Sequence, residues 1–392
     1  MIVKPKIRGF ICTTAHPTGC ENAVKAQIDY VKSKPKVNGA KKVLVIGASM
    51  GYGLASRISA AFSCGAATIG VIFDKQGSNT RTGSAGWYNT AAFEKFAHAE
   101  GLYAKTINGD AFSQTVKDEV ISLIKQDIGK VDLVIYSLAA PRRTAPDGTV
   151  YSSVLKTVGE SYSNKTIDLK NMSISNVTVD PATDDEIANT VKVMGGEDWL
   201  DWIEQMKAAD VLADGALTLA YSYIGPVLTH PMYLNGTIGQ AKAHLAATAK
   251  KITADIDGVT AYVSVNKALV TQSSSAIPIV PLYISILYKV MKEMGLHEGC
   301  IEQMQRMLAD KVYGGAVETD EAGLIRMDDW EMRPDVQDKV SALWADISDE
   351  TLATSADIAG YQHDFSEIFG FDVPNTDYEA ETDPSIGIES IE

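Results

Sequence analysis

Short apolar runs alternate with amphipathic segments over the first third of the chain. Apolar runs bounded by turn residues predict buried strands, and the longer segments between them have the residue spacing of helices. This alternation is typical of βαβ units and predicts a parallel sheet. The predicted strands cover residues 41–49, 67–74, 102–108 and 130–140, and the predicted helices cover 51–63, 91–101 and 113–128.

The pattern changes at residue 141 and later returns. Residues 141–180 are rich in Ser, Thr and Asn, and their short alternating runs predict a small β-insertion. Beyond it the pattern predicts helix over 184–212 and 239–252, strands at 216–225 and 260–270, a helix after Ser275 and a polar helical tail from about residue 315. No linker interrupts these elements. We therefore expect one elaborated α/β domain, built on a Rossmann-type doubly wound parallel sheet.

Charge and composition exclude several classes of protein. The chain has 392 residues and a formal net charge of -15. Non-specific nucleic-acid binding needs a basic face, so this charge argues against a nucleic-acid partner. A local cluster of donors can still bind a phosphate-rich cofactor, because short-range contacts override the overall sign.

Cysteines and apolar stretches place further limits. The four cysteines are scattered and form no CxxC pair, which argues against a disulfide framework and a zinc site. The first residues lack the sustained apolar region of a signal peptide. The most apolar stretch, residues 276–291, contains two prolines and is too short to cross a bilayer. A cytoplasmic protein with reduced thiols and no membrane partner is expected.

A glycine-rich turn follows the first predicted strand and precedes a predicted helix. Glycine permits the close backbone approach that a pyrophosphate needs, and a helix N-terminus supplies free N–H groups. The position between an apolar strand and an amphipathic helix favours a dinucleotide site over a simple tight turn. The residues of this turn are Gly47, Ala48, Ser49, Met50, Gly51, Tyr52 and Gly53.

The ends of the next strands carry further candidates for cofactor contacts. Asp74 ends the second strand, where a carboxylate can accept hydrogen bonds from the adenosine hydroxyls and repel a 2′-phosphate. This favours NADH over NADPH, although Lys75 and Arg81 are close in sequence. Residues 109–111 end the third strand, where a side chain can meet the adenine, and the small residues at 137–139 end the fourth. Ordinary loop chemistry is the alternative for each of these positions.

Tyrosines and a lysine in the second half can carry the chemistry of a reductase. Reductases of this fold use a tyrosine hydroxyl to stabilise and protonate an oxyanion, with a lysine nearby that lowers the tyrosine pKa and binds the nicotinamide ribose. Tyr233 and Lys242 are nine positions apart, which on one continuous helix would put them about 180° apart. They can converge only if Tyr233 lies before the helix, and Gly236 and Gly239 make such a break easy. A surface tyrosine and a solvated lysine are the alternative.

Several segments closely resemble one family. They are IGASMGYGLASRI, GSAGWYN, GDAF, YSLAAPRR, VMGGEDW, YSYIG, GTIGQAK, SVNKALVTQSSSAIP, HEGCIEQ and AGYQHDF. The sequence is similar to the monomeric trans-2-enoyl-CoA reductases and to the NADH-dependent enoyl-ACP reductases of the long, Tyr-x8-Lys type. The similarity runs from MIVKPK near the start to FGFDV near the end, so it covers nearly the whole chain.

The resemblance implies an enlarged short-chain dehydrogenase/reductase fold with a helical lid around the substrate. It implies that NADH reduces the C2=C3 double bond of a trans-2-enoyl thioester in fatty-acid synthesis, with Tyr233 as the proton donor, Lys242 on the cofactor ribose and Tyr223 on the substrate. The implied NAD contacts are Gly47, Ala48, Ser49, Met50, Gly51, Tyr52, Phe73, Asp74, Asp110, Ala111, Leu138, Ala139, Lys242, Val270, Thr271 and Gln272. Met50 stands where the family pattern has a small polar residue, and its side chain is expected to point outward. Asp74 stands where Glu is common.

With this resemblance the expected single domain divides into four parts. A cofactor-binding half covers about 41–140, the β-insertion 141–180, a catalytic and acyl-pocket half 181–315, and a helical C-terminal extension 316–392. The implied assembly state is a monomer, and the partner is an acyl-CoA or acyl-carrier-protein thioester. The carrier and the preferred chain length stay open.

Some residues and functions keep two interpretations. Arg142 and Arg143 can meet a substrate phosphate or form a structural salt bridge, and residues 278–288 form either plain core or the wall of an acyl pocket. The histidines at 16, 230, 244, 297 and 363 show no metal-binding spacing, so structural roles are expected. A carbonyl reductase or alcohol dehydrogenase of the same superfold would need a Tyr-x3-Lys pair, which YSYIG lacks. A non-catalytic NAD-binding protein would bind NADH without turnover.

Overall fold

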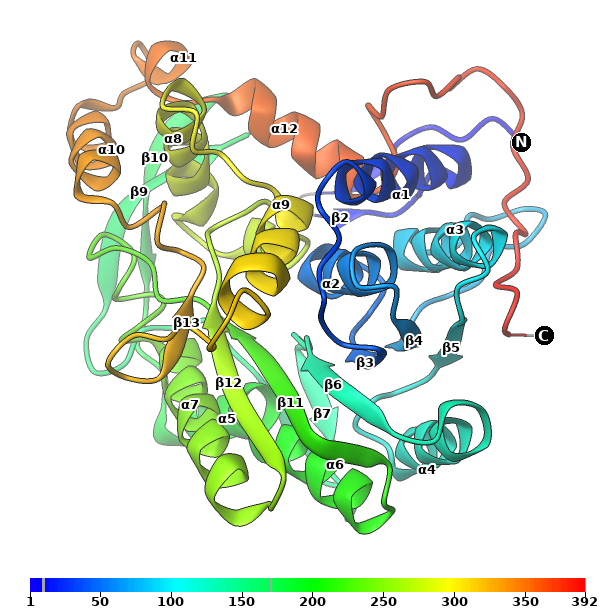
Figure 1. The fold of residues 1–392 in the computed structure, drawn as a ribbon. Coiled ribbons are helices and arrows are strands. Elements are labelled where there is room, and N and C mark those ends of the chain that lie inside the picture. The colour runs from blue at the N-terminus through cyan, green and yellow to red at the C-terminus, as the bar shows by residue number, and fades with distance from the viewer. Residues whose placement is uncertain (9–10, 170, 392) are drawn as a thin grey trace.

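The computed structural model describes residues 1–8, 11–169 and 171–391, and its centre is a seven-stranded parallel sheet (Figure 1). The strand order is β13-β12-β11-β6-β3-β4-β5, and every neighbouring pair is parallel. The strands are β3 (Lys42–Ile46), β4 (Ala67–Ile72), β5 (Ala104–Asn108), β6 (Val131–Tyr136), β11 (Leu212–Ser222), β12 (Val259–Val265) and β13 (Leu324–Arg326).

The strand order reverses between β3 and β6. From β3 the chain builds outward through β4 and β5, and then it crosses back to β6 and builds the other way. Ligands of such sheets bind outside the carboxyl ends of the strands at this reversal. The side chains of Val43 to Ile46 on β3 are fully buried, as expected for a strand covered on both faces. The predicted doubly wound sheet is confirmed.

Helices cover both faces of the sheet (Figure 1). The core on one face joins the strands to α1 (Pro17–Lys32), α2 (Gly51–Phe62), α3 (Ala85–Ala99) and α9 (Cys300–Arg306). The core on the other face joins them to α4 (Gln114–Leu123), α6 (Glu197–Ala208) and α7 (Thr237–Asp255), and α5 (Asp184–Met194) packs on α7. The helix predicted over 184–212 is therefore wrong as one element, because α5 ends at Met194 and α6 begins at Glu197, with Gly195 and Gly196 between them. A Cβ at Gly196 would lie 2.2 Å from the Thr248 hydroxyl oxygen, so this close approach requires glycine.

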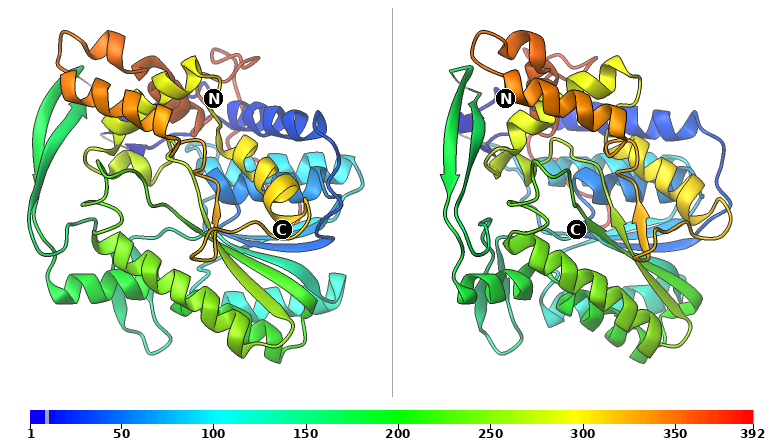
Figure 2. Two further views of the ribbon diagram at one scale, coloured as in Figure 1. Left: turned by 60° about the vertical axis from the view of Figure 1, so that its left-hand side comes forward. Right: turned by 90° about the vertical axis from the view of Figure 1, so that its left-hand side faces the viewer.

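The β-insertion consists of two antiparallel hairpins, which confirms its prediction. They are β7 (Arg142–Thr144) with β8 (Val150–Ser152), and β9 (Tyr162–Asp168) with β10 (Ser173–Val179). Figure 2 shows the second hairpin running along one side of the molecule from the lower helices to the helices at the top. The amine of Lys165 on this hairpin donates to the carbonyl oxygens of Trp344 and Ile347, which fastens the insertion to the C-terminal helices.

The C-terminal region is more than the expected helical tail. Its β13 adds the seventh strand beside β12, and α10 (Pro334–Asp346), α11 (Leu352–Ser355) and α12 (Ile358–Glu367) follow. Both α10 and α12 pack on α8 (Val280–Glu293), the helix predicted after Ser275. Most of α8 is buried, and Trp344 and Tyr361 lie in the same core. No helix among the described residues is long and apolar enough to span a bilayer.

A buried polar cluster joins residues 386–390 to the N-terminal half. Arg57 on α2 and Glu94 on α3 are both fully buried, and a guanidinium nitrogen lies 3.9 Å from a carboxylate oxygen. Glu94 also accepts hydrogen bonds from the amide and the hydroxyl of Ser390, at 3.0 and 2.7 Å. The Trp87 indole N–H donates to the Ile386 carbonyl at 2.7 Å. The C-terminal segment thus completes the core beside α3, on the side where both ends of the chain lie (Figure 1).

Candidate active site

The glycine-rich turn lies at the strand reversal and fits a dinucleotide pyrophosphate. A Cβ at Gly47, whose φ is +85°, would lie 2.2 Å from the Ser137 carbonyl oxygen, and a Cβ at Gly53 would lie 1.9 Å from the Gly47 carbonyl oxygen. These approaches require glycine and bring the ends of β3 and β6 against the start of α2. No side chain caps the N-terminus of α2. Its N–H groups can therefore receive an anion.

Hydrogen bonds to neighbouring elements fix the other residues of this turn. Ala48 is fully buried, its N–H donates to the Val71 carbonyl at 3.0 Å, and the Ser49 carbonyl accepts from the Asn89 amide. The Tyr52 hydroxyl donates to the Lys267 carbonyl at 2.6 Å. Met50 is half-buried and packs against the core. The expectation that its side chain points outward is therefore only partly met, because the core covers part of it.

The segment after β12 reaches the same turn. A Cβ at Gly51 would lie 4.0 Å from the Thr271 side-chain methyl, so Thr271 stands beside the start of α2. Val270 is buried, and its N–H donates to the Tyr288 hydroxyl, whereas Gln272 is exposed. The structure thus brings Thr271, which lies 220 positions after Gly51 in the sequence, to the glycine turn. The cofactor contacts expected of these residues stay a prediction.

Asp74 is fixed just beyond the end of β4. Its carboxylate accepts a hydrogen bond from the Ser84 hydroxyl at 2.7 Å, and its N–H donates to the Asn108 side chain at 2.9 Å. A Cβ at Gly86 would lie 2.5 Å from the carboxylate, so the first turn of α3 closes directly over Asp74. Phe73 is 80% exposed. A carboxylate held at this place suits an adenosine ribose.

The ends of β5 and β6 supply the remaining predicted contacts. Asp110 accepts a hydrogen bond from the Phe112 N–H at 3.0 Å, and the carbonyl of buried Ala111 accepts from the Trp202 indole. Leu138 packs beside Gly47, whereas Ala139 is exposed. These residues border the same edge of the sheet, because the carboxyl ends of parallel strands meet there.

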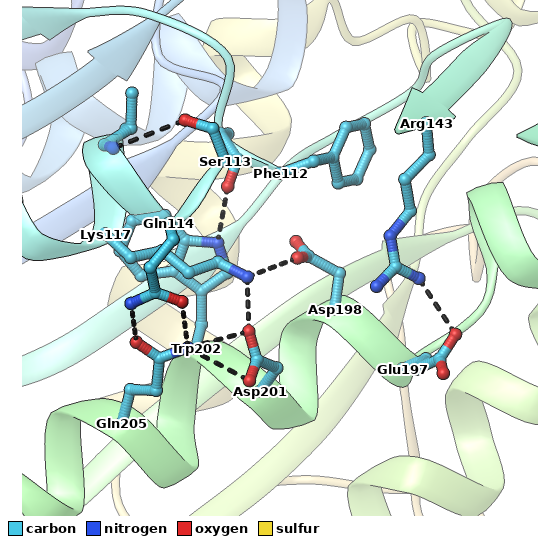
Figure 3. A network of polar contacts seen from close by, with 12 residues as sticks. Phe112, Ser113, Gln114, Lys117, Arg143, Glu197, Asp198, Asp201, Trp202 and Gln205 are labelled. Atoms are coloured by element: carbon cyan, nitrogen blue, oxygen red, sulfur yellow. Dashed lines mark hydrogen bonds and ion pairs between the residues drawn. The ribbon is translucent and has the colours of Figure 1, made fainter. Parts of the chain in front are cut away.

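A network of charged side chains joins the two helices next to this carboxyl edge of the sheet (Figure 3). The amine of buried Lys117 on α4 contacts the Asp198 carboxylate at 2.6 Å and also the Asp201 carboxylate, both on α6. Burial raises the pKa of Asp198, and the charge of Lys117 opposes that rise. The network ties α4 to α6 below the loop that holds Ala111.

The two arginines after β6 have different environments. Arg143 is buried, and its guanidinium donates to the Glu197 carboxylate at 2.9 Å and to the Lys192 carbonyl at 2.8 Å (Figure 3). Arg142 is exposed. Of the two interpretations, the structural salt bridge holds for Arg143.

Tyr233 lies before the helix that carries Lys242. It is part of a turn that ends at Gly236, and α7 begins at Thr237. A Cβ at Gly239 would lie 2.3 Å from the Tyr233 carbonyl oxygen and 2.0 Å from that of Leu234. Glycine at this position therefore lets the turn fold back over the first turn of α7. The expected break between the tyrosine and the lysine is confirmed.

The environment of Tyr233 differs from one expectation. Its ring packs edge-on against Tyr223, with centroids 4.6 Å apart, and its hydroxyl makes no hydrogen bond to any residue that the structure describes. Burial raises the pKa of Tyr233, and the carboxylate of Glu331 adds to the rise. The Lys242 amine donates to the Tyr221 carbonyl at 2.8 Å, and burial lowers its pKa to about 8. The expectation that Lys242 lowers the pKa of Tyr233 is therefore wrong for this structure.

Two buried charged residues next to the tyrosines were not predicted. Glu331 is fully buried and accepts hydrogen bonds from Tyr223, Tyr283 and the Ala268 N–H. Lys267 is 2% exposed, and its amine donates to the Ala268 carbonyl. Neither residue carries a recognisable signal along the chain, because Glu331 stands among other charged residues and Lys267 is a single lysine after an apolar strand.

Other predicted features have simpler outcomes. His16 accepts a hydrogen bond from the Gly19 N–H at the start of α1, which is the structural role expected. On α12, however, the possible ligand atoms of His363, Asp364 and Glu367 lie within 4.8 Å of one another, a grouping that spacing along the chain did not predict. Residues 282–288 of α8 are buried in the core that Tyr223 and Tyr233 border. Their interpretation as an acyl-pocket wall stays a prediction.

Replacement of Gly239 by alanine should displace the Tyr233 turn. The added methyl group would meet two backbone carbonyl oxygens at 2.3 Å or less, and backbone cannot step aside as a flexible side chain can. A displacement of about 1 Å can cost about 10²-fold in rate. Steady-state kinetics should show a lower kcat with NADH affinity retained. Gly65→Ala is the matched control for a loss of stability, because nothing surrounds Gly65 and its φ is +67°.

Three family models match the chain. They are described as the NAD(P)H binding domain of trans-2-enoyl-CoA reductase at residues 2–79, the trans-2-enoyl-CoA reductase catalytic region at 81–313, and an enoyl reductase FAD binding domain at 319–382. The first range contains the glycine turn and Asp74. The second contains Tyr223, Tyr233 and Lys242.

The residues at 319–382 do not fit a flavin dinucleotide. This range holds seventeen Asp and Glu against three Lys and Arg, so nearly all of the net negative charge of the chain lies here. The starts of its two longer helices already carry carboxylates. Asp335 pairs with Arg333 at the start of α10, and Asp357 accepts from the Gly360 N–H at the start of α12. Neither helix start offers a pyrophosphate the open, uncharged N–H groups found at α2.

Named relatives match over the whole length. The chain is 59% identical to an NADH-dependent enoyl-acyl-carrier-protein reductase of Flavobacterium johnsoniae, and 57% identical to an NADH-dependent trans-2-enoyl-CoA reductase of Ruminiclostridium cellulolyticum; each match covers 100% of both chains. The crystal structure of Treponema denticola trans-2-enoyl-CoA reductase in complex with NAD superposes with a TM-score of 0.95, at 50% identity over 100% of both chains. The chain therefore belongs to the trans-2-enoyl-CoA reductase family.

Proposed function

We propose that this chain uses NADH to reduce the C2=C3 double bond of trans-2-enoyl thioesters carried on coenzyme A or acyl carrier protein. The observation that carries the proposal is the glycine-broken turn that presents Tyr233 before α7, with a hydroxyl that forms no hydrogen bond to the residues that the structure describes. β11 ends at Ser222, so Tyr223 and this turn leave the sheet at the same carboxyl edge as Gly47. The relatives named above are NADH-dependent reductases of these two thioester types.

In this proposal, each part of the site has one task. The turn from Gly47 to Tyr52 would hold the cofactor pyrophosphate, Asp74 the adenosine ribose and Lys242 the nicotinamide ribose. NADH, when bound, supplies a hydride. Tyr233 donates a hydrogen bond to the thioester oxygen, where negative charge develops as the β-carbon is reduced, and is the favoured source of the proton for Cα. A donor preorganised for a developing oxyanion is among the largest single contributions to catalysis.

An assay of NADH oxidation tests the reaction type. Crotonyl-CoA and a longer enoyl thioester should be reduced, and acetoacetyl-CoA should not. Turnover of acetoacetyl-CoA alone would indicate a carbonyl reductase instead. Binding of NADH without turnover on any of these thioesters would indicate a non-catalytic NAD-binding protein. Parallel assays with enoyl-CoA and enoyl-acyl-carrier-protein compare the two carriers.

Asp74 should determine the choice between NADH and NADPH. Asp74→Ser removes the carboxylate that suits the adenosine hydroxyls and would repel a 2′-phosphate, so NADH should bind more weakly and NADPH relatively better. The ratio of kcat/KM for the two cofactors measures this change. Asp110→Ser is a useful comparison, because Asp110 lies on the next strand end. An unchanged NADH/NADPH ratio in Asp74→Ser would reject the assignment of the ribose site.

We further propose that the chain acts in the cytoplasm as a monomer in fatty-acid synthesis, and that its four parts form one domain. Sedimentation at several protein concentrations tests the monomer. A single unfolding transition by calorimetry would support the single domain, and separated transitions would contradict it.

A further inference from the structure

Glu331 lies in the turn between β13 and α10, inside the range matched to a flavin-binding model, and its carboxylate reaches the tyrosines of the proposed active site. One carboxylate oxygen accepts from Tyr223 at 3.0 Å and from Tyr283 at 2.6 Å, and the other accepts from the Ala268 N–H at 2.7 Å. The Gln337 amide holds the turn by donating to the Glu331 carbonyl at 2.7 Å. We infer that Glu331 is a positioning residue that acts through Tyr223 on Tyr233, an inference that rests on the proposed function.

The hydrogen atoms available decide which of the two tyrosines can donate to a substrate. A phenol has one O–H, and that of Tyr223 is used in the hydrogen bond to Glu331. The hydroxyl of Tyr233 makes no hydrogen bond to the described residues and is free to donate to a substrate. Tyr223 therefore has no hydrogen left to donate to a substrate oxygen, and its role is to pack against Tyr233. Tyr233 is the donor of the pair.

Packing carries the effect of Glu331 to Tyr233. The two tyrosine rings meet edge-on, with centroids 4.6 Å apart and planes at 76°. An edge-on contact fixes the orientation of both rings, because the edge of one faces the π-surface of the other. Anchoring the Tyr223 hydroxyl thus restrains the direction in which Tyr233 presents its own.

The negative charge of Glu331 also affects the pKa of the two tyrosines. Burial raises the pKa of Glu331, while the nearby Lys267 ammonium, the Tyr283 hydroxyl and the Ala268 N–H favour its ionised form. The Glu331 carboxylate in turn raises the pKa of Tyr223 and Tyr233. The carboxylate thus adds to the preference of both phenols for the protonated form, which a proton donor needs.

A double-mutant cycle tests the inference. Glu331→Gln weakens the hydrogen bond from Tyr223, because a neutral amide has one acceptor oxygen where the carboxylate has two and cannot accept from both the tyrosines and the Ala268 N–H. Tyr223→Phe removes the same hydrogen bond. Each variant should therefore lower kcat with crotonyl-CoA, on the order of 10²-fold for a misplaced donor, and leave the KM for NADH unchanged. The double variant should lose no more than the larger single loss, because Glu331 acts through Tyr223. Losses that multiply would overturn the inference.

Asp328→Asn is the matched control. Asp328 is also fully buried, lies three positions before Glu331, and pairs with Arg326 rather than with a tyrosine. Asp328→Asn should lower the melting temperature and leave kcat unchanged. A loss of kcat in this variant as large as that in Glu331→Gln would overturn the inference. If Glu331→Gln does not fold, Glu331→Asp replaces it in the double-mutant cycle, because aspartate keeps the negative charge but its shorter side chain places the carboxylate farther from Tyr223. A wild-type chain that reduces no enoyl thioester would overturn the proposed function and this inference together, whereas a multiplying cycle overturns only the latter.

Discussion

Tyr233→Phe should lower kcat with crotonyl-CoA by about 10²–10⁴-fold, the usual loss for one positioned acid, and leave the affinity for NADH nearly intact. The phenyl ring keeps the edge-on contact with Tyr223, so the change removes only the free hydroxyl. Stopped-flow or steady-state kinetics measure kcat, and quenching of protein fluorescence measures NADH binding.

Tyr103→Phe is the control for the loss of a phenol. Tyr103 directly precedes β5 at the amino edge of the sheet, opposite the proposed site, and its hydroxyl donates to Asp127 at 2.7 Å. It should leave kcat unchanged. Near-normal kcat in Tyr233→Phe would transfer the donor role elsewhere, with Tyr223 first in line.

Lys242→Met should raise the KM for NADH and lower kcat together. If the Lys242 ammonium holds the nicotinamide ribose, its loss weakens both cofactor binding and the stabilisation of the developing oxyanion. Lys242→Arg should rescue activity only in part, because a planar guanidinium does not replace a compact ammonium at the same point. Lys250→Met, at an exposed position farther along the same helix, should match the wild type.

The same lysine predicts a dependence on pH. Burial lowers the pKa of Lys242 to about 8, so its charge is present below this pH and is lost as the pH rises through it. In the wild type, the KM for NADH should increase as the pH rises past about 8. In Lys242→Met, the KM for NADH should not change over the same pH range. Wild-type-like kinetics in the Met variant would reject the assignment of Lys242 to the nicotinamide ribose.

Local pattern predicted the central elements because local and long-range forces agree there. The strand at Lys42–Ile46 is apolar throughout since helices cover both of its faces. Gly47 and Gly53 have to be glycine for steric reasons that any strand-to-helix turn of this shape imposes. The spacing of Tyr233 and Lys242 allows them to converge only if Tyr233 lies before the helix, the glycines at 236 and 239 permit that break, and the structure contains it.

Other features depend on partners far along the chain. The three residues of β13 form a strand because β12 offers them an open edge, and two apolar residues in a row are too few to predict a strand from the sequence. Glu331 becomes part of the site because folding brings it to Tyr223, 108 positions away. The pKa of Tyr233 follows from burial and from Glu331 rather than from the spacing to Lys242.

The cluster of Arg57, Glu94 and Ser390 has a consequence for how the protein is made. Residues leave the ribosome in sequence order, and N-terminal regions begin to fold first. The carboxylate of Glu94 must wait almost 300 further residues for the two hydrogen bonds that Ser390 donates. A buried carboxylate that lacks some of its partners is costly, so the N-terminal half cannot complete its packing around α3 before Ser390 has been synthesised. A chain that stops short of Ser390 never completes this packing.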